Sequence, residues 1–114
     1  MELLIDNALN IGSDEFYRSS RYALPLVVML VNSEDKKAFN ILEENIRKTD
    51  IIQQLDSETV IVFLSHTSFN EANHFIQKME EKFSFSYTSK EYKGSETKFL
   101  KTLFLENSDK SMML

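Results

Sequence analysis

Residues 47–67 read RKTDIIQQLDSETVIVFLSHT and predict a β-hairpin. The short polar stretch Asp56-Ser57-Glu58 separates two runs, IIQQL before it and TVIVFL after it. Side chains of these three types favour local hydrogen bonds to the backbone over continuation of a strand. The run after the turn is wholly apolar from Val60 to Leu64, whereas Ile51–Leu55 is mixed in polarity. We therefore expect the second strand at the centre of a sheet and the first at an edge.

Two further strands are predicted outside the hairpin. The stretch Leu26–Val31, LVVMLV, is a continuous apolar run rich in β-branched residues, which is typical of a strand buried on both faces. The stretch Phe83–Tyr87, FSFSY, alternates apolar and polar residues, as a strand with one wet face does. The first should join the centre of the sheet, and the second should form the other edge.

Apolar residues at helical spacing predict four helices around these strands. Serine residues followed by acidic residues mark the starts of the first three, and Ser68 with Glu71 forms a capping box. The first helix should end before Pro25, because the residue before a proline disfavours the helical conformation. The predicted helices begin at Ser13, Ser33, Ser68 and Glu96, and the last ends at Glu106.

The order of these elements predicts an α+β domain with a ferredoxin-like β-α-β-β-α-β antiparallel sheet and helices on one face. In that arrangement the first and third strands are central and the second and fourth lie at the edges, which is the partition that the apolar patterns indicate. We expect one domain over residues 13–106. Residues 1–12 should be an N-terminal segment or linker, and residues 107–114, which show no pattern, a C-terminal tail.

Composition and net charge disfavour several classes of function. The chain has 114 residues, no cysteine and a formal net charge of −5, which disfavours broad attraction to nucleic acid or anionic lipid. No apolar run approaches the roughly 20 residues of a membrane-spanning helix, and the N-terminus lacks the positive start of a signal peptide. We therefore expect a cytoplasmic protein without membrane insertion and without a nucleic-acid partner.

The spacing within residues 47–60 carries a family resemblance. Arg47-Lys48-Thr49-Asp50, the five residues Ile51–Leu55 and then Asp56-Ser57-Glu58-Thr59-Val60 follow one another without a gap. This segment resembles RxxD-x5-GGDEF of the diguanylate cyclase-like (GGDEF) family. The stretch RYALPL at residues 21–26 also resembles the family's entry to its first strand. The resemblance implies a nucleotide cyclase-like core over roughly residues 15–105.

The resemblance also implies a chemistry that this sequence has lost. Diguanylate cyclases condense two GTP molecules into cyclic di-GMP with two Mg²⁺ ions, held by an acid at the end of the first strand and by the third residue of the GGDEF turn. Here Asn32 replaces the first acid, and Glu58 takes the third turn position. The remaining turn positions are also altered: Asp56 and Ser57 replace the two glycines, and Thr59 replaces the glutamate.

These replacements predict a domain with no catalytic residues, no metal site and no cofactor. An amide oxygen is a poor substitute for a carboxylate with a hard dication. The segment between Asn32 and Asp50 is also too short to hold the family's guanine-reading stretch together with a full helix. We therefore expect a catalytically inactive, GGDEF-like regulatory module of a bacterial signalling system, which acts through a protein partner or as a homodimer.

Arg47 and Asp50 leave a second function open. In the family, RxxD is an inhibitory site, where the arginine grips phosphate or a guanine edge and the aspartate accepts hydrogen bonds from guanine. Arginine and aspartate suit that chemistry. The alternative is structural: Arg47 interacts with the end of its helix while Asp50 caps the turn into the strand. The second function is thus a cyclic di-GMP receptor that binds its ligand through Arg47 and Asp50.

Overall fold

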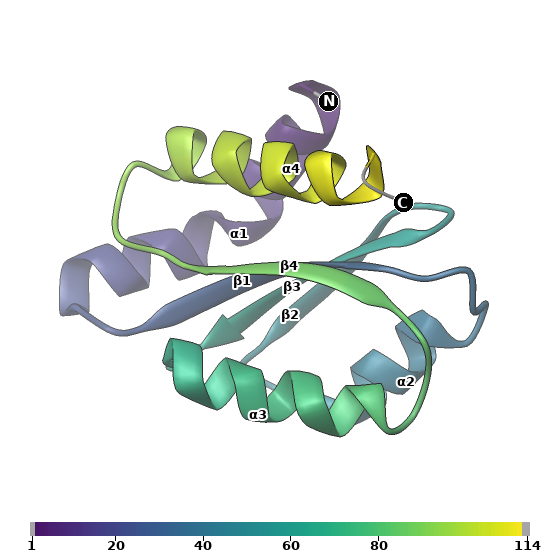
Figure 1. Cartoon of the computed structure of the whole chain (residues 1–114). Helices are drawn as coiled ribbons and strands as arrows, with labels where there is room; N and C mark the ends of the chain where they lie inside the picture. The colour runs from purple at the N-terminus through teal and green to yellow at the C-terminus, as the bar shows by residue number, and fades with distance from the viewer. Residues whose placement is uncertain (1, 113–114) are drawn as a thin grey trace.

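The computed structural model describes the backbone of residues 2–112 and the side chains of residues 2–109. Its centre is a four-stranded antiparallel sheet in the order β2-β3-β1-β4 (Figure 1). The two wholly apolar strands are central and the two mixed strands lie at the edges, as the sequence predicts. The elements are α1 (Glu2–Tyr22), β1 (Leu26–Asn32), α2 (Ala38–Asn45), β2 (Ile51–Asp56), β3 (Thr59–Ser65), α3 (Phe69–Glu80), β4 (Ser86–Glu91) and α4 (Glu96–Met112).

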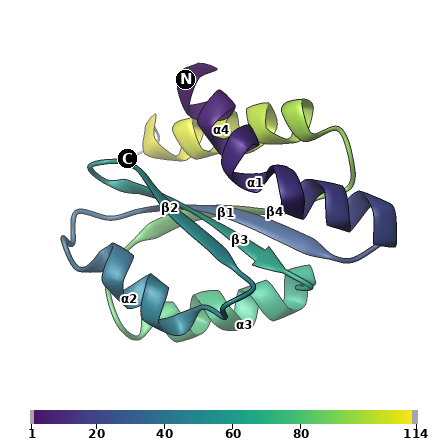
Figure 2. The ribbon, with the colours of Figure 1, turned by 180° about the vertical axis from the view of Figure 1, so that it is seen from behind.

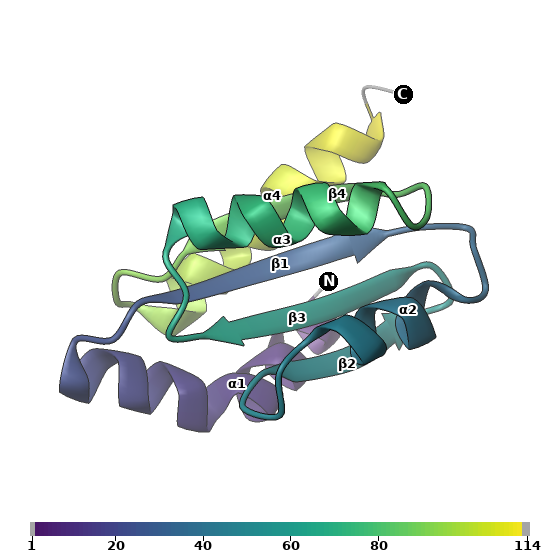
Figure 3. The ribbon, with the colours of Figure 1, turned by 90° about the horizontal axis from the view of Figure 1, so that it is seen from below.

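Helices cover both faces of this sheet. The two connecting helices α2 and α3 lie together on one face, as expected for a ferredoxin-like order (Figure 2, Figure 3). Helices α1 and α4 lie on the opposite face, so the prediction that helices cover one face is wrong for the sheet as a whole. The physical reason lies in β1 and β3, whose side chains are apolar on both sides and need cover on both.

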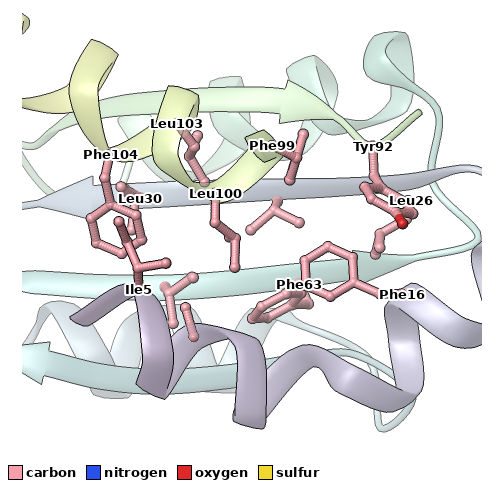
Figure 4. Close-up of a cluster of buried hydrophobic side chains, with 13 residues drawn as sticks. Ile5, Phe16, Leu26, Leu30, Phe63, Tyr92, Phe99, Leu100, Leu103 and Phe104 are labelled. Atoms are coloured by element: carbon pink, nitrogen blue, oxygen red, sulfur yellow. The ribbon is translucent and has the colours of Figure 1, made fainter. Parts of the chain in front are cut away.

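The sheet therefore separates two hydrophobic cores. Val27, Met29 and Val31 of β1 pack with α2 and α3, while Leu26, Val28 and Leu30 pack with α1 and α4. In the second core Phe16 lies between the rings of Phe63, Tyr92 and Phe99 (Figure 4).

Helix α1 approaches the sheet closely at Gly12. A Cβ atom built on Gly12 would lie 2.3 Å from Cε2 of the Phe63 ring, so a larger residue would displace either the helix or the ring. Upstream of this contact, Ile5 and Ala8 are buried in the same core. Residues 2–12 are thus part of α1 and not a linker, and the helix start predicted at Ser13 is wrong.

Helix α2 also begins later than predicted. Ser33 does not cap it, because Ser33 Oγ accepts a hydrogen bond from the backbone N–H of Asp35 and donates one to the carbonyl of Ser84. Asp35 in turn accepts from the backbone N–H of Lys37, and the helix starts only at Ala38. Residues 33–37 thus form a hydrogen-bonded turn that joins β1 to α2.

The C-terminal part of the fold also extends beyond the predicted bounds. The last strand begins at Ser86 and not at Phe83, whose side chain enters the core beside α3. Helix α4 continues to Met112, so residues 107–112 are not an unpatterned tail. Residues 113 and 114 of that predicted tail lie outside the described residues. None of the helices, over the residues that the structure describes, is long and apolar enough to cross a membrane.

Candidate functional site

Arg47 and Asp50 form a two-pronged ion pair in the turn between α2 and β2. Arg47 Nε lies 3.2 Å from Asp50 Oδ2, and Arg47 Nη2 lies 3.1 Å from Oδ1. The backbone N–H of Arg47 also donates to Oδ2 at 2.9 Å. The structural alternative is therefore right for Asp50, which caps the turn that leads into β2, whereas the Arg47 side chain binds Asp50 and not the end of α2.

The same pair reaches across to the end of β3. Asp50 Oδ1 accepts from the backbone N–H of Ser65 at 3.0 Å and from Ser65 Oγ at 3.2 Å. Arg47 Nη2 donates to the carbonyl of Ser65 and to Thr67 Oγ1. We call Arg47, Asp50, Ser65 and Thr67 the clasp, because they fasten the α2–β2 turn to the end of β3.

The clasp surrounds a strained residue. His66, between Ser65 and Thr67, has a φ of +50°, which costs a residue with a side chain about 1 kcal/mol. Thr67 Oγ1 donates back to the carbonyl of Ser65 at 2.8 Å and so bridges this residue. The hydrogen bonds on both sides of His66 hold the chain in the conformation that leads from β3 into α3.

Burial differs sharply between the two charged members of the clasp. The Asp50 side chain is 2% exposed, whereas that of Arg47 is 55% exposed. Both carboxylate oxygens of Asp50 are engaged by donors from this chain. A ligand that needs this carboxylate would therefore have to displace hydrogen bonds of the fold, whereas about half of the Arg47 side chain is exposed to solvent.

The capping box of α3 lies near the clasp. Ser68 Oγ accepts from the backbone N–H of Glu71, and Glu71 Oε1 accepts from the backbone N–H of Ser68. The hydrogen bonds from Ser68 lower the pKa of Glu71 below its ordinary value of 4.5, and the charges of Arg47 and His74 add to this effect. This part of the molecule thus favours an ionised carboxylate.

Asn32 lies at the opposite end of the sheet and faces inward. Its Nδ2 donates to Thr59 Oγ1 at 3.1 Å, and its Oδ1 accepts from Asn107 Nδ2 at 2.7 Å. Asn107 Nδ2 also lies 3.2 Å from Thr88 Oγ1. We call these four residues the amide cluster. It closes one end of the core beneath α4 with neutral hydrogen bonds.

The hairpin turn is held by its own backbone contacts. Asp56 Oδ1 accepts from the backbone N–H of Glu58 at 3.0 Å, which confirms the predicted local side-chain bond. The carbonyl of Glu58 accepts from the backbone N–H of Ser33 at 2.9 Å. Asp56, Ser57 and Glu58 are exposed, and Glu58 lies beside Asn32, Glu34 and Asp35 around an open hollow of about 540 Å³.

This arrangement does not fit the two metal ions that the resemblance implies. The Asn32 oxygen already accepts a hydrogen bond from Asn107 and is directed into the amide cluster. No group of three or more carboxylate, histidine or cysteine side chains within the described part of the chain is placed to hold a metal ion. Glu58, Glu34 and Asp35 line the hollow without a basic residue among its lining side chains.

The sequence singles out two members of each network, Arg47 and Asp50 in the clasp and Asn32 and Thr59 in the amide cluster, and gives no sign of the other two. Asn32 and Thr59 were singled out as altered turn and strand positions, but Asn107 lies 75 residues beyond Asn32 and shows no motif. Ser65 is the last residue of β3 and Thr67 lies in the loop after it, where a polar residue is ordinary. Both are buried, which the structure shows and the sequence does not.

No protein-family model and no curated protein matches this chain. Among solved structures, a DGC protein from Thermotoga maritima has a similar fold. The match has a TM-score of 0.50 and 14% sequence identity, and it covers 75% of this chain and 76% of that chain. Identity this low bears on the fold alone. The ferredoxin-like sheet of this chain is thus similar to that of a DGC protein, which supports a GGDEF-like fold.

Proposed function

We propose that this protein is a non-catalytic, GGDEF-like regulatory module of a bacterial signalling system that acts through contacts with other proteins. The observation that carries the proposal is the position of Asn32, which stands where the family has a metal-binding acid. Its amide is held on both sides by Thr59 and Asn107. The residue therefore serves the packing of α4 against the sheet in place of binding a cation.

The charge around the hairpin turn supports the same proposal. Three carboxylates, Glu34, Asp35 and Glu58, line the hollow beside Asn32. A nucleotide triphosphate carries several negative charges, and its binding needs metal ions or basic side chains to offset repulsion. Asp56 adds a further negative charge in the turn where the family has glycine.

The direct test is incubation of the protein with GTP and either Mg²⁺ or Mn²⁺, with chromatographic detection of cyclic di-GMP. We expect no product. Asn32→Asp alone should not restore activity, because Asp56, Ser57 and the short β1–α2 connection still differ from the family. Turnover that is abolished by Glu58→Gln, in protein purified the same way, would contradict the proposal.

The half-exposed side chain of Arg47 favours one other candidate, a cyclic di-GMP receptor. A micromolar ligand requires about 8 kcal/mol, of which a two-pronged arginine contact contributes about 2 to 3. Calorimetric titration with cyclic di-GMP distinguishes the candidates. Our proposal predicts no heat of binding up to millimolar ligand, whereas saturable binding that Arg47→Ala weakens about a hundredfold would establish the receptor.

A further inference from the structure

The outer edge of β4 presents backbone groups to solvent. The backbone N–H of Tyr92 donates to the carbonyl of Leu26 at 2.8 Å, and the register pairs Val28 with Lys90. Because hydrogen-bonded pairs alternate along an antiparallel ladder, even-numbered residues of β4 bond to β1. The N–H and C=O groups of Ser89 and Glu91 therefore point away from the sheet, and none of them bonds to another described residue.

The opposite edge of the sheet is protected. The register of β2 shifts between Gln54 and Asp56, a bulge that interrupts a regular edge. The Gln54 side-chain amide donates to the carbonyls of Asp56 and Thr59, and that of Gln53 donates to the carbonyl of Gln54. Side chains of β2 thus occupy acceptors near its own edge, and β4 has no bulge of this kind in its register.

A groove runs along the β4 edge between two helices. Viewed onto this edge, α4 lies above β4 and α3 lies below it (Figure 1). The groove has a volume of about 450 Å³. Its floor is β4, one wall comes from α3 and the other from α4. The lining residues are Phe69, Asn73, Tyr87, Thr88, Ser89, Glu106 and Asp109.

The two walls differ in chemistry. On the α3 side, the wall carries Phe69, which is 45% exposed, and Asn73, and the half-buried Tyr87 lies on the β4 floor, so this side is uncharged and partly aromatic. On the α4 side, the wall carries the carboxylates of Glu106 and Asp109. Lys90 Nζ lies 3.1 Å from Glu106 Oε1, which leaves Asp109 as the uncompensated charge of this wall. The groove thus offers uncharged, partly aromatic surface on one side and carboxylates on the other.

We propose that β4 accepts an extended segment of a partner protein as a fifth strand, and that this segment alternates apolar and basic residues. Side chains of a strand alternate between faces, so every second residue would meet Phe69 and Tyr87, and the residues between them would meet the acidic wall. The inference rests on the proposed function, since it states the chemistry of the protein contact through which the module acts.

Charge complementarity argues against a second copy of this chain as the occupant. A second copy would carry the same two carboxylates, Glu106 and Asp109, beside its own β4 edge, in place of the basic residues that complement this wall. The chain also has a net charge of −5, so two copies repel each other at long range. A basic strand is attracted to the same wall.

The test uses the full chain labelled with ¹⁵N and a synthetic peptide of about seven residues that alternates valine and lysine. At roughly tenfold excess over its Kd, the peptide should slow amide exchange of Ser89 and Glu91 about tenfold. Exchange at Ile52 and Gln54 on the β2 edge should not change. A peptide that alternates valine and glutamate should bind much more weakly. Equal binding of the two peptides, or exchange at Ser89 that does not respond, would overturn the proposal.

Two variants distinguish pairing of the peptide with the β4 edge from electrostatic attraction of the peptide to the protein. Ser89→Pro removes the outward donor at an edge position that tolerates proline, and it should abolish protection at Glu91. Asp109→Asn should raise the peptide Kd about threefold, while the matched control Asp6→Asn on α1 should leave it unchanged.

Sedimentation and the cyclase assay distinguish the remaining outcomes. Concentration-dependent dimers that protect Ser89 without peptide would overturn the partner strand in favour of a second copy. Failure of the peptide in a protein that still makes no cyclic di-GMP refutes this inference and leaves the proposed function intact. Turnover of GTP refutes the proposed function whatever the peptide does.

Discussion

The two ends of β3 fasten the sheet with different chemistry. At its last residue, Ser65 is held by the charged pair Arg47 and Asp50. At its first residue, Thr59 is held by the neutral amide of Asn32, and through it by Asn107 of α4. Both ends carry positions that resemble a ligand or metal site of the GGDEF family. The hydrogen-bond partners of a residue in the fold therefore indicate its role better than its residue type does.

The clasp and the amide cluster differ in what they leave behind when one member is removed. Loss of Asp50 would leave the buried N–H of Ser65 without an acceptor and the guanidinium of Arg47 without its counter-charge. Loss of a member of the amide cluster leaves only uncharged groups. Unpaired charge costs more than an unpaired neutral group. Substitutions at the two ends of β3 should therefore lower the free energy of unfolding by unequal amounts.

The largest expected effect is that of Asp50→Ala in the clasp. It should lower the free energy of unfolding by about 3 kcal/mol, reduced from the value for a fully buried pair because Arg47 is half-exposed. Urea denaturation followed by circular dichroism measures it. Asp14→Ala, an exposed change on α1, serves as the control and should stay within about 0.5 kcal/mol. An equal loss in both variants would remove the distinction between clasp and surface.

The amide cluster should respond less strongly. Asn107→Ala removes the donor to Asn32 Oδ1 and to Thr88 Oγ1, and it should cost about 2 kcal/mol. Lys101→Ala on the exposed side of α4 is the control for helix propensity. A loss in Asn107→Ala that exceeds the loss in Asp50→Ala would reverse the comparison between the two ends of β3.

A smaller effect is expected for Arg47→Ala. The buried carboxylate of Asp50 would keep its three bonds from Ser65 and from the backbone of Arg47, so the loss should be about 1 to 1.5 kcal/mol. Arg47→Lys should recover part of it, since an ammonium restores charge but not the two-pronged geometry. The coupling between Arg47 and Asp50, measured by a double-mutant cycle, should vanish if the ion pair does not form in solution.

The smallest expected effect is a pH dependence near the clasp. The folded-state pKa of Glu71 is lowered, so its contribution to stability is complete above the ordinary pKa of 4.5 and is lost as the pH falls through the lowered value. Wild type and Glu71→Gln should therefore converge in stability at acidic pH. The amide cluster contains no titratable side chain, so the cost of Asn107→Ala should not vary over the same range. A varying cost would show that the cluster is coupled to a charge.

The sequence predicts the central strands of the sheet better than the helices that cover it. Uninterrupted apolar runs placed β1 and β3 at the centre, and one capping motif located the start of α3. The same runs also indicate that both faces of the sheet need to be covered. The two connecting helices of a ferredoxin-like order cover only one of them. Ser13, followed by two acidic residues, predicted a helix start inside what is α1, although the helix runs through this point and Gly12 allows its close approach to Phe63.

The candidate site was predictable only in part. Local bonds, such as those of Asp56 with Glu58 and of Arg47 with Asp50, follow from residues close in sequence. The bonds of Asn32 with Asn107 and of Asp50 with Ser65 depend on how distant segments meet. Polar side chains without periodicity give no sign of such partners, because tertiary packing alone brings them together.

The placement of α1 and α4 on one face has a consequence for synthesis on the ribosome. Strands β1 and β3 and helices α2 and α3 can emerge and assemble one core while α4 is still inside the exit tunnel. Phe63 and Leu30 on the other face then have α1 as their only helical cover, although α4 supplies Leu100 and Leu103 to the same core. The nascent chain thus exposes an apolar half-sheet until α4 has left the tunnel, a state in which chaperones are expected to bind it.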